Sequence, residues 1–110
     1  YKAGKLKMLA VSTPKRVAQA PEVPTVGETV PGYEAYTWFS MYFPAGTPKD
    51  IVARMNREAV RILASDDLKK RFADLGAEPV GGSPEQLAAF MASETAKWAK
   101  VIRDSGAKVD

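Results

Sequence analysis

Proline is concentrated in one stretch of this 110-residue chain. Four of its eight prolines fall within residues 14–32: Pro14, Pro21, Pro24 and Pro31. Because proline lacks a backbone N–H and fixes its φ angle, this stretch can be neither a long helix nor a central strand. We expect an irregular connection here, with one helical turn after Thr25, and regular elements on either side of it.

Strands are predicted on both sides of this connection. Residues 6–11 become continuously apolar and the run ends before Pro14, which is typical of a short buried strand. Residues 33–43 are rich in aromatic side chains and predict a long strand. A further short strand is expected over residues 77–80.

The second half of the chain carries helix signals. Thr47-Pro48-Lys49-Asp50 places a hydroxyl at an N-cap, proline at the first helical position and a carboxylate at the third. Ser65 is expected to cap a second, short helix, and Ser83 with Gln86 to form the capping box of a third. The last two helices are each followed by a glycine, which favours a helix end. We expect the helices to share a core: Ile51, Met55, Ile62, Leu68, Phe72, Phe90 and Trp98.

The composition excludes several kinds of chemistry. The chain has no cysteine and no histidine, which excludes disulfides, Cys/His metal sites and histidine-dependent triads. Asp66 and Asp67 could be a catalytic acid pair, but carboxylates in a first helical turn usually serve the helix dipole. No apolar run approaches the roughly 18–20 residues of a membrane span. We therefore expect no enzyme activity, no cofactor and no metal.

Basic residues gather at the start of the chain, although the net charge is only +3. We interpret this cluster as a solvated strand edge, with an anionic-ligand contact and a nucleic-acid contact as alternatives. The dense basic stripe and stacking aromatics of a nucleic-acid reader are absent. Gly81-Gly82 before a helix is interpreted as a turn rather than a phosphate cradle, since the P-loop lysine is missing. The basic cluster consists of Lys2, Lys5, Lys7, Lys15 and Arg16.

The chain resembles the solute-binding receptors of tripartite tricarboxylate transporters, also called Bug-type receptors. The resemblance is carried by five segments in the family's order: "KLKMLAVSTPKR", "PEVPTVGE", "PGYEAYTWFSMYFPAGTP", "GAEPVGGSPEQLAAF" and "WAKVIRDSGAKVD". It covers essentially the whole chain.

The resemblance implies an α/β, two-lobed periplasmic-binding-protein fold of type II-like architecture. Its ligand, a small organic carboxylate, would lie between the lobes and be delivered to membrane permease subunits. The chain would be the C-terminal part of such a receptor, and its start at Tyr1 fits a fragment or processed product. Residues 1–32 would be the tail of the second lobe, 33–46 the strand crossing between lobes, and 47–110 the helical part of the first lobe. The compartment would be the periplasm.

The same resemblance nominates ligand-binding residues. Ser12 and Thr13 follow a predicted strand, and ligands in open α/β sheets bind beyond the carboxyl ends of strands. Lys15 and Arg16 follow and could help to hold a carboxylate; a simple strand-to-loop cap is the alternative. The crossing segment adds Thr37, Trp38, Phe39 and Ser40, although the family commonly has glycine where Ser40 stands.

Two other interpretations stay open at this point. The chain could be a structural fragment without ligand affinity, which pairs with a second copy through uncovered strands, residues 33–43 above all. This predicts a homodimer or higher oligomer. An enzyme or regulatory domain that only looks like the receptor is the third interpretation, disfavoured by the missing histidine, cysteine and acid pair.

Overall fold

The computed structural model describes residues 3–108, and the chain divides into two compact units, Tyr1–Tyr42 and Phe43–Asp110. Lys2, which belongs to the basic cluster, lies outside the described residues.

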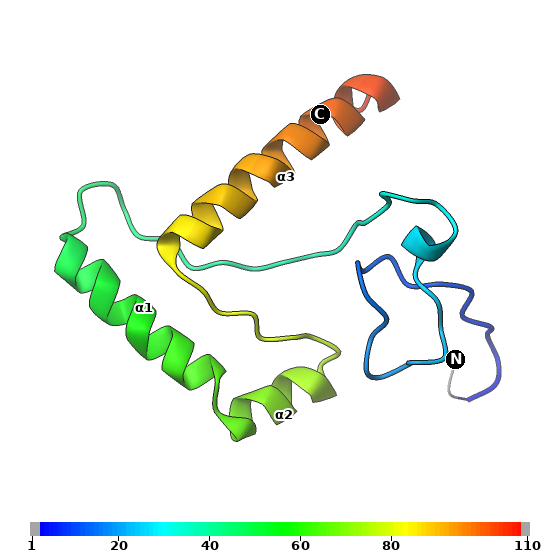
Figure 1. Ribbon diagram of the computed structural model, residues 1–110, viewed down its shortest axis with the longest axis horizontal. Helices are drawn as coiled ribbons and strands as arrows, with labels where there is room; N and C mark the ends of the chain where they lie inside the picture. The colour runs from blue at the N-terminus through cyan, green and yellow to red at the C-terminus, as the bar shows by residue number, and fades with distance from the viewer. Residues whose placement is uncertain (1–2, 109–110) are drawn as a thin grey trace. The chain divides into compact units, whose positions relative to one another are not determined.

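The backbone of the first unit is joined around Val11 (blue to cyan in Figure 1). Val11 and Thr25 form an isolated parallel bridge, in which two hydrogen bonds of 2.9 Å join Val11 to the backbone of residues 24–26. The Ala35 N–H donates to the Ser12 carbonyl at 2.9 Å. The segments around Thr25 and Ala35 are thus hydrogen-bonded to two adjacent residues, Val11 and Ser12.

One helical turn follows the bridge, as predicted. The 3-10 helix η1 spans Val26–Glu28 and is capped by Thr25. The Glu28 N–H donates to the Thr25 hydroxyl at 3.2 Å, and the Thr25 N–H donates to the Glu28 carboxylate at 3.0 Å. This capping box gives side-chain acceptors to two backbone amides at the start of the short helix.

The strand predictions are wrong for the described residues. Residues 6–11, 33–43 and 77–80 contain no β-strand, and of these residues only Val11 takes part in a bridge. A strand exists only as part of a hydrogen-bonded ladder, whereas an apolar or aromatic run indicates no more than extended, buried backbone. Along these runs the described chain supplies only isolated contacts, such as the bridge at Val11 and the Ala35–Ser12 hydrogen bond, which do not make a ladder. Helices and irregular segments therefore replace the α/β arrangement that was expected.

The three predicted helices are confirmed. In the second unit, α1 spans Lys49–Leu63, α2 spans Asp66–Asp74 and α3 spans Pro84–Ser105 (Figure 1). Gly76 and Gly106 follow α2 and α3 with φ angles of 71° and 68°. These angles lie in the left-handed region that glycine adopts without a steric penalty, which ends both helices.

Capping differs from expectation at two of the three helix starts. Ser83 and Gln86 form the predicted capping box of α3. In α1 the N-cap is Pro48, without a side-chain cap, and the Thr47 hydroxyl donates to the Pro44 carbonyl at 2.8 Å. Ser65 is the N-cap of α2, but its hydroxyl donates backwards to the Ile62 carbonyl at 2.7 Å. A donated hydroxyl hydrogen stabilises the preceding turn instead of the first amides of the helix.

The expected helical core is not buried among the described residues. The buried apolar residues are Ala20 and Val23, both in the first unit. Trp98 is 39% exposed, and its Nε1–H donates at 3.0 Å to the carboxylate of Glu94, which is buried. The periodic spacing indicates an apolar stripe, but burial also needs a second layer, which a periodicity does not supply.

Candidate ligand-binding site

Ser12 and Thr13 lie directly after the bridge at Val11, in a turn whose two hydroxyls differ. The Ser12 side chain is exposed, and within the described part of the chain its hydroxyl donates to no atom. The Thr13 hydroxyl donates to the Lys15 carbonyl at 2.7 Å. A hydroxyl has one hydrogen, so Ser12 is available as a donor to a ligand whereas Thr13 is left as an acceptor.

The other four predicted residues lie on one extended segment. Side-chain exposure alternates along it: Trp38 and Ser40 are partly buried, whereas Thr37 and Phe39 are exposed, Phe39 to 94%. Such alternation is the two-residue period of extended backbone. A ligand approaching one face of the segment would therefore meet two of the four side chains.

The six predicted residues are only partly brought together. Ser12 is tied to Ala35, two residues before Thr37. At about 3.3 Å per extended residue, Thr37 lies about 7 Å and Ser40 about 17 Å further along the chain. Ser12, Thr13 and Thr37 are thus within reach of one small ligand, and Ser40 requires a longer one.

Two of the open hollows formed by the described residues of the first unit are lined by no predicted site residue. One, of about 480 Å³, is lined by Pro14, Thr25, Gly27, Glu28, Gly32, Tyr33 and Glu34. The other, of about 550 Å³, is lined by Leu6, Lys7, Met8, Leu9, Glu22, Val23 and Pro24. Two carboxylates border the first hollow, so it suits an organic anion poorly by itself.

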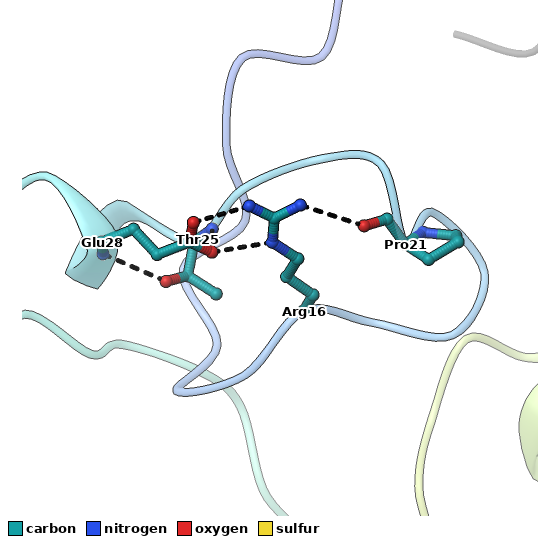
Figure 2. Close-up of polar contacts among 4 residues, drawn as sticks. All are labelled: Arg16, Pro21, Thr25 and Glu28. Atoms are coloured by element: carbon teal, nitrogen blue, oxygen red, sulfur yellow. Dashed lines mark hydrogen bonds and ion pairs between the residues drawn. The ribbon is translucent and has the colours of Figure 1, made fainter.

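An ion pair between Arg16 and Glu28 lies beside the first hollow (Figure 2). Arg16 Nε donates to Glu28 Oε1 at 2.8 Å, and Nη2 donates to Oε2 at 2.6 Å. Nη1 donates to the Pro21 carbonyl at 3.3 Å. The hydrogen bonds from Arg16, and then from the Thr25 N–H, lower the pKa of Glu28 from 4.5 to about 2. The same pairing raises the pKa of Arg16.

This pairing changes the interpretation of the basic cluster. Arg16 was considered as a carboxylate contact, but each of its guanidinium nitrogens already has an acceptor within the chain. Sequence reasoning missed Glu28 as its partner, because the two residues are twelve positions apart and no local period connects them. A signal for the pair would have required covariation among relatives.

Two other groups considered as possible sites, Gly81-Gly82 and Asp66-Asp67, have local structural roles. Gly82 accepts a hydrogen bond from Asn56 Nδ2 at 2.8 Å, which ties the turn before α3 to α1. Asp67 pairs with Arg71 at 3.0 Å on the exposed face of α2. Among residues 3–108, no group of three metal-ligating side chains is found and no helix is long and apolar enough to cross a membrane.

Comparison with known proteins assigns the chain to a family of receptors. A family model described as "Tripartite tricarboxylate transporter family receptor" matches residues 1–107. Protein BugT of Bordetella pertussis is 37% identical over 109 residues, which are 98% of this chain and 33% of BugT. A UPF0065 protein from the tcbD-tcbE intergenic region of Pseudomonas sp. strain P51 is 39% identical over 102 residues, or 91% of this chain and 30% of that protein.

A solved structure, R. palustris Rpa4515 with adipate, has a TM-score of 0.80 and 40% sequence identity to this chain. The match covers 96% of this chain and 36% of that one. The chain thus spans about a third of the length of these relatives. Since the family model matches residues 1–107, the chain belongs to the tripartite tricarboxylate transporter family of receptors.

Proposed function

We propose that this chain is part of a periplasmic receptor that binds a small organic carboxylate and delivers it to the permease subunits of a transporter, without catalysis. One observation carries the proposal: Rpa4515, 40% identical over nearly the whole chain, has been solved with adipate. Adipate is a flexible dicarboxylate, and this makes dicarboxylates the first ligand class to test, ahead of tricarboxylates, acidic amino acids and aromatic acids.

The proposed ligand contacts are Ser12, Thr13 and the segment 37–40. The Ser12 hydroxyl donates to a ligand carboxylate, which needs no buried cation because charge-assisted hydrogen bonds are the stronger kind. The Thr13 hydroxyl, whose hydrogen is engaged by Lys15, accepts from a ligand hydroxyl or a bridging water. One face of the segment 37–40, either Thr37 with Phe39 or Trp38 with Ser40, lines the path of the ligand's carbon chain. Arg16 is not among the contacts.

The proposed division of the chain follows the family. Residues 1–32 belong to the second lobe, 33–46 cross between lobes and 47–110 belong to the first lobe. The ligand lies between the lobes, so the contacts proposed here are only those supplied by this third of the receptor. No nucleic acid is involved.

A second candidate function is favoured by one specific feature. Phe39 is 94% exposed and Met41 65% exposed on a segment that forms no ladder with the other described residues. Uncovered extended backbone with apolar side chains recruits further strands. The 110-residue chain by itself therefore forms a homodimer or higher oligomer, with little or no affinity for organic acids.

Calorimetric titration separates the two candidates. The probes are adipate, citrate, glutamate and benzoate, added to the 110-residue chain and to a hybrid in which this chain replaces the matched part of Rpa4515. Binding by the hybrid supports the receptor function. Ser12→Ala should then weaken binding about tenfold, because a hydrogen bond to a charged group is lost. Thr13→Ala should have a smaller effect, and Ser93→Ala on α3 is the matched control. A hybrid that binds none of the four acids contradicts the proposal.

A further inference from the structure

We infer that the Arg16–Glu28 ion pair is a positioning device for the Ser12–Thr13 turn and does not itself contact the ligand. The inference rests on the proposed function, because it assigns the turn to ligand binding. A basic residue near an anion site can bind the anion directly or hold in place the residues that bind it, and Arg16 has the second role.

All three guanidinium nitrogens of Arg16 already donate within the chain, through three of the five N–H bonds of the group. Two of its nitrogens donate to the two Glu28 oxygens at 2.8 and 2.6 Å, and the third donates to the Pro21 carbonyl at 3.3 Å (Figure 2). A bidentate pair of this kind has one geometry, which fixes the plane of the guanidinium. A ligand carboxylate would have to displace Glu28 or share the guanidinium with a second negative charge.

The ion pair connects the two ends of the Ser12–Thr13 turn. Glu28 also accepts from the Thr25 N–H at 3.0 Å, and Thr25 is bridged to Val11, immediately before Ser12. Arg16 lies four residues after Ser12. The short turn 12–15 is therefore held at both ends by one connected network. Fixing both ends removes backbone conformations that the turn would otherwise have to lose on ligand binding.

The Arg16 and Glu28 side chains are 46% and 43% exposed, and exposed ion pairs contribute little to global stability. The contacts of the pair lie within residues 16–28 and reach Val11 through Thr25, so loss of the pair acts first on this part of the chain. Loss of the pair should therefore change ligand affinity more than it changes the unfolding midpoint.

The variant Glu28→Gln gives opposite results for the two roles. Glutamine keeps an oxygen for the Thr25 N–H but removes the charge that neutralises Arg16. If Arg16 positions the turn, adipate binding by the hybrid should weaken about tenfold, through faster dissociation. If Arg16 is a ligand-binding cation restrained by Glu28, freeing it should tighten binding. Arg16→Lys, which keeps the charge but not the fork, should weaken binding as well.

The matched control is the exposed ion pair Arg61–Glu58 on α1, at 2.8 Å. Glu58→Gln removes a carboxylate from an arginine in the same way and should leave adipate binding unchanged. An affinity for Glu28→Gln that is equal to or higher than that of the parent hybrid overturns the inference.

A second measurement does not depend on any ligand. The Ala35 N–H donates to the Ser12 carbonyl, so its hydrogen exchange reports the order of the turn in the 110-residue chain. Exchange of this amide should be several-fold faster in Glu28→Gln and Arg16→Lys than in the parent or in Glu58→Gln. Unchanged exchange overturns the inference even if the hybrid binds adipate. If the parent hybrid binds no acid, the receptor proposal fails while exchange still decides whether the pair orders the turn.

Discussion

The cap of α3 offers the sharpest test of the helix assignments. The Ser83 hydroxyl accepts from the Gln86 N–H at 3.3 Å, and the Ser83 N–H donates to Gln86 Oε1 at 2.8 Å. Ser83→Ala removes the first bond and leaves the second. Removing an N-cap acceptor typically costs about 1 kcal/mol, and the long first bond places the expected loss toward about 0.5 kcal/mol. With a denaturant dependence of about 1 kcal/mol per molar urea, the midpoint should fall by about 0.5–1 M.

The assay is urea denaturation followed by circular dichroism at the helix band. Ser83→Asp, which keeps an acceptor at the N-cap and adds a favourable charge, should retain the midpoint of the parent chain. Thr47→Ala should have a smaller effect than Ser83→Ala, because the Thr47 hydroxyl donates to Pro44 and caps no helix amide. A larger shift for Thr47→Ala, or equal shifts for Ser83→Asp and Ser83→Ala, would refute this account of the caps.

Three further predictions test separate features. The hydrogen bonds from Arg16 lower the pKa of Glu28 to about 2. The contribution of the ionised carboxylate to stability is therefore present above pH 4.5 and is lost as the pH falls through about 2. NMR of the carboxyl carbon should show this pKa, and Arg16→Gln should return it toward 4.5. Trp98→Phe should lower stability by about 1 kcal/mol in thermal melts, because buried Glu94 loses a donor, and Trp98→Ala should still fold, since Trp98 is 39% exposed. Light scattering at micromolar concentration should detect a dimer or higher oligomer that involves residues 33–43; a monodisperse monomer would contradict that interpretation.

The helices could be predicted from the sequence because their signals are local. The Ser83–Gln86 capping box and the glycines after α2 and α3 act within a few residues of the backbone they satisfy. Thr47 shows the limit of such reasoning. A hydroxyl before proline suits an N-cap, but the choice between accepting from a helix amide and donating to Pro44 depends on the preceding turn.

The strands and the core could not be predicted in the same way. Residues 33–43 have the composition of a strand, yet a ladder needs a partner at a distance in the chain. Trp98 lies on an apolar stripe, yet its burial depends on what packs against the stripe.

The sequence nominated the candidate site residues without the hydrogen bonds that set their chemistry, and their contact with a ligand stays a prediction. Ser12 and Thr13 follow an isolated bridge residue, Val11, in place of the predicted strand, and only the structure distinguishes the engaged hydroxyl from the available one. The partnership of Arg16 with Glu28 crosses a proline-rich connection whose path no local rule defines.

The exposure of Phe39 has a consequence for proteolysis. Proteases bind their substrates as extended backbone, by adding it as a strand to their own edge. A bulky aromatic side chain, 94% exposed on extended backbone, offers a chymotrypsin-like protease both the conformation and the side chain that it cleaves beside. This position is three residues before the boundary between the two compact units at Tyr42. A single cut there would separate the chain almost along its own division into units.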